Sequence, residues 1–99
     1  MAEDVATVIT DNFVTVFAVK KDGTLWAWGR NDCGQLGIGN TIDQFSPIKV
    51  TDNISTVVAN ESSVFAMKKD NSLWAWGENF YGELGVGDTT DRHIPVKVA

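Results

Sequence analysis

LWAWGRNDCGQLGIGN occupies Leu25–Asn40, and LWAWGENFYGELGVGD occupies Leu73–Asp88. The two stretches are 48 residues apart, and this spacing holds without an insertion from residue 12 to residue 98. Between 12–50 and 60–98, 22 of 39 aligned positions are identical. A period of roughly 40 to 50 residues is typical of an array in which no unit buries its core alone.

Each unit has the pattern of four short β-strands, because β-branched and aromatic residues dominate and no helical periodicity occurs. Tight hairpins are expected at Gly23 and Asn71, which tolerate a positive φ. Pro47 and Pro95 begin the last expected strand of each unit, where a proline suits a sheet edge. The expected strands are 5–10, 14–20, 24–28 and 47–50, then 54–58, 62–68, 72–76 and 95–98.

The Leu-Trp-Ala-Trp strand predicts how the units stack. Side chains alternate along a strand, so Trp26 and Trp28 share one face while Leu25 and Ala27 share the other. Both faces are apolar, and both must therefore be covered. Stacked propeller blades cover both faces of each sheet. We predict an all-β chain of two four-stranded antiparallel blades, at residues 5–50 and 53–98, forming one structural unit.

The motif Leu-Trp-Ala-Trp-Gly-x-Asn-x-x-Gly-x-Leu-Gly-x-Gly, followed by Thr-x-Asp and Pro-x-x-Val, resembles the repeat of the regulator of chromosome condensation family. The match spans both repeats. The resemblance implies one four-stranded propeller blade per repeat and a ring of seven blades in full-length members. The residues that carry this blade signature are Trp26, Trp28, Gly29, Gly34, Leu36, Gly37 and Gly39, with Trp74, Trp76, Gly77, Gly82, Leu84, Gly85 and Gly87 in the second repeat.

The functions that the resemblance implies are diverse. Members include nucleotide-exchange factors for a small GTPase, chromatin binders, membrane-traffic regulators and protein inhibitors of β-lactamase, and a fold does not choose among them. Two departures matter. The Gly and His that often precede the family's second strand are missing from residues 11–14 and 59–62. The chain also has two repeats, which cannot close a ring.

Charge and composition exclude several partners. The chain has 13 acidic and 8 basic residues, a net charge of −5, and no cluster of cations. We therefore expect no binding to nucleic acid, whose phosphates require clustered Lys and Arg, and none to a membrane. Cys33 is the single cysteine, so no intrachain disulfide forms. The acidic N-terminus lacks the pattern of a signal peptide, and as written we expect a cytoplasmic protein.

No motif indicates an enzyme, a metal or a cofactor. The glycine-rich loops have the wrong order for a dinucleotide fingerprint and lack the Lys-Ser/Thr of a P-loop, so we assign their glycines to a tight turn with positive φ. Leu36 and Leu84 are expected to anchor these loops. His93 is interpreted as a solvated loop residue, and the alternative is a weak metal site with the nearby Asp88 and Asp91, whose places in the first repeat are taken by Asn40 and Asp43. Asp43 and Asp91 are expected to cap a turn.

Positions that differ between the repeats are candidates for a binding surface. The expected loop tips are Arg30, Asp32, Cys33 and Gln35 in the first repeat and Glu78, Phe80, Tyr81 and Glu83 in the second. Exposed aromatic residues make good interface anchors. Phe80 and Tyr81 are therefore the candidates for contact with a protein partner, the alternative being that they pack on a neighbouring blade.

The leading functional hypothesis is a non-enzymatic repeat unit that self-assembles into a ring and offers its loops for protein binding. Three chains would supply six blades and four would supply eight, so a homotrimer or homotetramer is expected, and 5–10 could complete a blade of a neighbouring chain. An enzyme with a pocket on the ring axis is one alternative. Another is a fragment of a larger guanine-nucleotide exchange factor. The sequence leaves open whether the unit is a natural short gene, excised or engineered.

Overall fold

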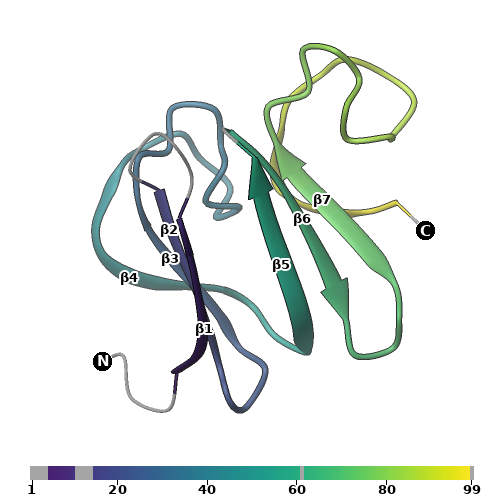
Figure 1. The fold of residues 1–99 in the computed structure, drawn as a ribbon. Helices are drawn as coiled ribbons and strands as arrows, with labels where there is room; N and C mark the ends of the chain where they lie inside the picture. Colours follow the sequence, from purple (N-terminus) through teal and green to yellow (C-terminus); the bar gives the residue numbers. More distant parts are fainter. Residues whose placement is uncertain (1–4, 11–14, 61, 99) are drawn as a thin grey trace.

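Eight antiparallel strands form two separate four-stranded sheets in the computed structural model, which describes residues 5–10, 15–60 and 62–98. Each sheet follows the chain order, β1-β2-β3-β4 and β5-β6-β7-β8 (Figure 1). We call them blade 1 and blade 2. Blade 1 contains β1 (Val5–Thr10), β2 (Thr15–Lys20), β3 (Leu25–Gly29) and β4 (Gln44–Thr51), and blade 2 contains β5 (Ile54–Asn60), β6 (Ser63–Lys68), β7 (Leu73–Gly77) and β8 (Arg92–Lys97).

The hairpins follow the turn chemistry of the sequence. Gly23 lies between β2 and β3 with a φ of 88°, and Asn71 takes the same place between β6 and β7 with a φ of 72°. Asparagine tolerates this left-handed conformation better than most residues because its short polar side chain bonds locally. The two hairpins therefore reach one geometry through different residues.

The edge strands are longer than the sequence pattern predicts. β4 begins at Gln44 rather than at Pro47, and β8 begins at Arg92 rather than at Pro95. Both strands pair with the end of their neighbour after a register shift, so that Gln44 lies opposite Gly29. A proline inside β4 is tolerated because β4 is an edge strand.

β1 completes its own blade. It pairs with β2 of the same chain, with Val8 opposite Ala18 and Ile9 opposite Phe17. The hypothesis that residues 5–10 complete the blade of a neighbouring chain is therefore wrong.

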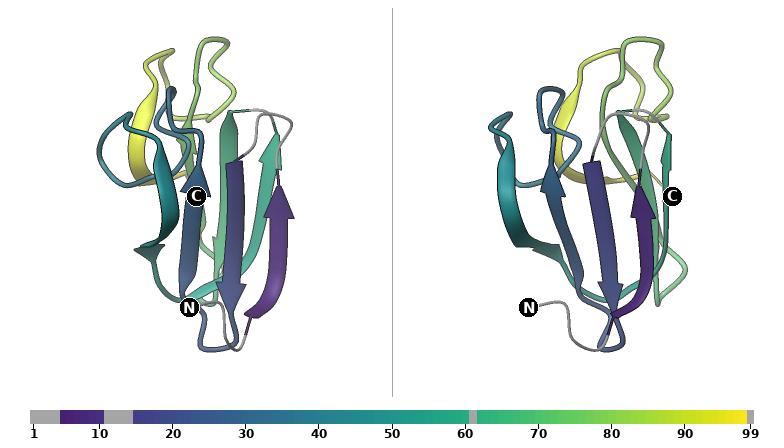
Figure 2. Two further views of the ribbon diagram at one scale, coloured as in Figure 1. Left: turned by 90° about the vertical axis from the view of Figure 1, so that its left-hand side faces the viewer. Right: turned by 60° about the vertical axis from the view of Figure 1, so that its left-hand side comes forward.

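The core lies between the blades, which stand side by side with β5 next to β1 and β2 (Figures 1 and 2). Blade 1 and blade 2 each turn one face toward this shared core. The core residues are Phe17, Val19, Leu25, Ala27 and Leu36 from blade 1, with Ile54, Val57, Val64, Ala66 and Trp76 from blade 2. The predicted alternation of faces is confirmed, since Leu25 and Ala27 face blade 2.

Among the residues that the structure describes, no other sheet covers the opposite face of either blade. On blade 1 this outer face carries Trp28, which is half-buried and lies opposite Val16 in the ladder. On blade 2 it carries Phe65 and Met67. Met67 is 37% exposed, whereas Val19 at the equivalent position of blade 1 is 6% exposed. The chain therefore has one covered blade-to-blade contact and two outer faces.

Candidate functional site

The segments that follow β3 and β7 contain the repeated motif, and we call them the first loop (residues 30–43) and the second loop (residues 78–91). A buried asparagine organises the first loop. The Asn31 side-chain amide donates to the carbonyls of Asn40 and Ile42, each at 3.0 Å, and its Oδ1 accepts from the backbone N–H of Leu36 at 2.9 Å. The side chain thus makes the hydrogen bonds that a neighbouring strand would otherwise make to these backbone groups.

The second loop repeats this arrangement. The Asn79 amide donates to the carbonyls of Asp88 and Thr90, and its Oδ1 accepts from the N–H of Leu84 at 3.0 Å. Leu36 and Leu84 are 0% and 1% exposed, and both are anchored as expected. Sequence reasoning missed the asparagines, although their identity in both repeats, two residues after the glycine that ends the strand, was a signal for a structural role.

Asp43 and Asp91 close the base of each loop. The Asp43 carboxylate accepts from the N–H of Asn31 at 2.8 Å, and that of Asp91 accepts from the N–H of Asn79 at 2.9 Å. These bonds join residues twelve positions apart. The expected side-chain to backbone bonds are therefore present, but each spans a whole loop and not a single turn.

The first loop lies between the two blades (Figure 1), where its glycines permit close contact with blade 2. Gly37 has a φ of 74°, and a Cβ at this position would lie 2.8 Å from Nε1 of Trp76. A Cβ at Gly34 would overlap the His93 ring. The backbone N–H of Gly39 donates to the carbonyl of His93 at 2.8 Å. These glycines thus provide a left-handed conformation and room for the next blade.

The second loop has the same backbone but no such neighbour. Gly85 has a φ of 74°, and a Cβ there would lie 3.5 Å from Val98, at ordinary contact distance. A Cβ at Gly87 would have no atom within 4 Å. Figure 1 shows this loop at the outer edge of blade 2, at upper right. No described residue packs on Gly87, so the surface beside this glycine is open in the described part of the chain.

Trp28 in β3 and Trp76 in β7 occupy equivalent positions, but Trp28 lies on an outer face and Trp76 lies on the covered face. Trp76 is fully buried, and its Nε1 donates to the carbonyl of Gln35 in the first loop at 2.9 Å. Trp28 is half-buried. Within residues 5–10, 15–60 and 62–98, no acceptor bonds to its Nε1. A buried indole N–H ordinarily finds a partner, so Trp28 lacks a contact that Trp76 makes.

The first tryptophan of each strand is bonded inside its own blade. Trp74 Nε1 donates to Ser72 Oγ, and that hydroxyl donates to Asp70 Oδ1. These Ser72 bonds lower the pKa of Asp70. Trp26 is bonded in the same way through Thr24.

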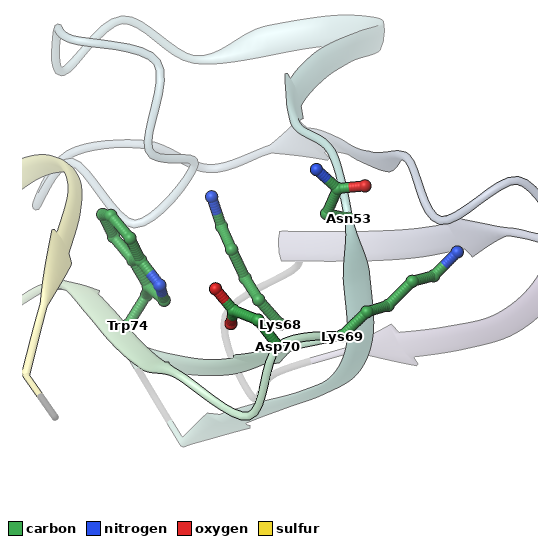
Figure 3. A pocket seen from close by; sticks show the side chains of 5 residues that line it. All are labelled: Asn53, Lys68, Lys69, Asp70 and Trp74. Carbon is green, nitrogen blue, oxygen red and sulfur yellow. The ribbon is translucent and has the colours of Figure 1, made fainter.

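A hollow beside Trp74 is lined by Asn53, Lys68, Lys69, Asp70 and Trp74 (Figure 3). The Lys68 amine lies 4.3 Å from the centre of the Trp74 ring, and Lys20 lies 4.5 Å from that of Trp26. Cation–π contacts of this kind stabilise exposed strands modestly. Because both repeats make the same contact, we assign it to the strand and not to a ligand.

His93 and Gln35 differ in part from the sequence interpretation. His93 is exposed as expected, but it lies in β8 near Gly34 and not in a loop. Gln35, expected at a loop tip, is fully buried because blade 2 covers it. Burial raises the pKa of the Cys33 thiol, which keeps it protonated and makes it a poor nucleophile.

Phe80 and Tyr81 project from the second loop. They are 67% and 82% exposed, and their rings meet edge to face with centroids 4.8 Å apart. Phe45 escaped the sequence analysis as an interface residue. Phe45 is 94% exposed. It is the counterpart of His93, which contacts the first loop, and this correspondence was the available signal.

The part of the chain that the structure describes contains no group of three or more His, Cys, Asp or Glu side chains placed to hold a metal ion. The same residues include no helix that is long and apolar enough to cross a membrane. In the first loop a carbonyl, a backbone N–H and small glycines fit Trp76 and the edge strand β8 of blade 2.

Known proteins share this architecture. Three solved structures resemble the whole chain: human WBSCR16, with a TM-score of 0.90 and 23% identity, and two structures of yeast RCC1 (Prp20), one bound to Kap60 and one of the Saccharomyces cerevisiae protein Prp20p, with TM-scores of 0.87 and 0.86 and 22% identity. The chain spans 26%, 24% and 25% of them. At this identity the likeness shows the fold.

The sequence relationships agree. A stretch of 33 residues is 52% identical to the ultraviolet-B receptor UVR8 of Arabidopsis thaliana, covering 33% of this chain and 8% of that protein. The regulator of chromosome condensation (RCC1) repeat matches residues 22–66 and 70–99. Because these matches cover most of the chain, it belongs to the regulator of chromosome condensation (RCC1) repeat family.

Proposed function

We propose that the chain is a non-enzymatic propeller unit whose function is to assemble with further copies of itself into a closed ring. The observation that carries this proposal is the pair of uncovered outer faces at the two ends of the chain. Phe65 and Met67 lie on one and Trp28 on the other. Soluble proteins rarely leave contiguous apolar patches of this kind in water.

Head-to-tail assembly covers both faces with one kind of contact. The two blades within one chain already meet head to tail, since the first loop of blade 1 packs on β7 and β8 of blade 2. A contact that repeats around an axis yields a ring if the rotation closes. Propellers close with about four to eight blades, which allows three or four two-blade chains.

The assembled ring would offer loop surfaces to a protein partner. Each chain contributes the exposed aromatic pair Phe80 and Tyr81 and carries a net charge of −5. Aromatic side chains supply much contact area for little conformational entropy. We therefore propose a protein ligand.

The mass of the purified chain in solution tests the assembly. Light scattering after size exclusion should give about 32 kDa for three chains or about 43 kDa for four, since one chain has a mass of 10.8 kDa. A folded species near the mass of one chain contradicts the proposal. In that case the outer faces would be covered by other blades of a longer protein, as in relatives four times its length.

A further inference from the structure

We infer that the joint between two copies is formed by the second loop of one copy and by Trp28 and Phe45 of the next, in the geometry of the joint inside the chain. This inference rests on the proposed function and names the surfaces through which it acts. The joint inside the chain serves as its template, because the repeats share both the loop and the strand that receives it.

Three contacts define the template. The indole N–H of Trp76 donates to the carbonyl of Gln35. The N–H of Gly39 donates to the carbonyl of His93. Gly37 lies flat against the Trp76 indole, where a Cβ would be only 2.8 Å from Nε1. A loop and an edge strand are thus joined by two hydrogen bonds and one close contact.

Each group of the template has a counterpart on an uncovered surface. Trp28 corresponds to Trp76, and its Nε1 has no acceptor in the described part of the chain. The carbonyl of Glu83 corresponds to that of Gln35. The N–H of Gly87 corresponds to that of Gly39 in the first loop, and the carbonyl of Phe45 corresponds to that of His93 in β8. Both halves of the joint are therefore present in one chain, at opposite ends, and only a second copy brings them together.

One difference between the repeats, Gln35 in the first and Glu83 in the second, makes the joint between copies weaker than the joint within a chain. Gln35 is fully buried in the template, where its Oε1 accepts from the N–H of Cys33 and its amide donates to Asp32 at 3.3 Å. Glu83 places a carboxylate at this position. It accepts from the N–H of Tyr81 at 2.8 Å and from Ser63 Oγ at 3.4 Å. Burying this charge is unfavourable compared with burying the amide.

The test compares two exposed phenylalanines. Phe45→Asp changes the joint, and Phe80→Asp is its matched control, because repeat 1 already carries Asp32 at the position of Phe80. Both changes add one negative charge to a side chain that is 94% or 67% exposed in the single chain. Circular dichroism should show native folding for both. We expect Phe45→Asp to raise the dissociation constant of assembly at least about tenfold and Phe80→Asp to change it less than about twofold.

Glu83→Gln supplies an outcome that misfolding cannot imitate. It restores the residue of the template, and sedimentation velocity over a concentration series should show assembly strengthened by about tenfold. If the unmodified chain assembles but neither Phe45→Asp nor Glu83→Gln alters that assembly, the joint is wrong while self-assembly stands. If the unmodified chain is a folded monomer, self-assembly itself is refuted.

Discussion

The first and second loops have nearly the same sequence and the same internal hydrogen bonds, yet they differ in what surrounds them. Asn31 and Asn79 hold the two loops in one conformation. The first loop meets blade 2, and its Gln35 is completely buried. The second loop ends at solvent, and its Glu83 is exposed. The motif therefore determines the shape of the loop, while the neighbouring blade determines its burial.

The same difference runs through the strands. Phe17 and Leu25 are fully buried on the covered face of blade 1, whereas Phe65 and Leu73 are half-buried on the outer face of blade 2. Identical residue types thus contribute unequally to stability, according to whether a blade covers them. Single substitutions at matched positions can measure this inequality directly.

The largest effect is expected for Trp76. Trp76→Ala should lower the free energy of unfolding by about 3–5 kcal/mol, because it removes a fully buried aromatic side chain. Trp28→Ala should lower it by about 1–2 kcal/mol, because Trp28 is only half-buried in the single chain. Urea denaturation followed by circular dichroism measures both, at concentrations where the chain is monomeric.

Raising the protein concentration turns this pair into a test of the outer face. If a second copy covers Trp28, the two losses should converge once the chain assembles, since association adds stability that Trp28→Ala forfeits. Equal losses in the dilute monomer would contradict the difference in burial between the two tryptophans.

An intermediate effect is expected for a pair of glycines with identical backbone conformation. Gly37 and Gly85 both have a φ of 74°, so alanine at either position should cost about 1–2 kcal/mol in backbone strain. Gly37→Ala should cost about 1–3 kcal/mol more, because its Cβ would press on Trp76. Thermal unfolding of the two variants gives the difference, and equal midpoints would show that the first loop does not pack as tightly as described.

Much of the fold follows from local sequence patterns. The alternation of Leu25, Trp26, Ala27 and Trp28 predicts the two faces of β3, and Gly23 predicts the hairpin before it, because these features depend only on neighbouring residues. The start of β4 at Gln44 could not be predicted in this way. It depends on a register shift against Gly29 on another strand.

The candidate site was predictable only in part, for the same reason. The positive φ of the loop glycines is a local property, and the pattern indicates it. The burial of Gln35 and the bond from Trp76 join residues 41 positions apart, across two blades. No pattern within one repeat contains that contact, so Gln35 is misplaced when the loop is considered alone.

The smallest effect is the response of the two loops to low pH, and it depends on one residue that differs between them. Asp88 lies where the first loop has Asn40, and each side chain accepts from an amide two residues later, that of Thr90 or Ile42, at 3.0 Å. The hydrogen bond from Arg92, followed by that from Thr90, lowers the pKa of Asp88. A lowered pKa means that this carboxylate stabilises the fold above the pKa of an unfolded Asp, about 3.9, and that the contribution is lost as the pH falls through the lower folded value.

In a titration from about pH 5 to pH 2, the amide resonance of Thr90 should shift with Asp88 while that of Ile42 follows no such step, because Asn40 carries no titrating proton. Asp88→Asn should abolish the Thr90 step, and a step of equal size at Ile42 in the unmodified chain would contradict the assignment of the Thr90 step to Asp88.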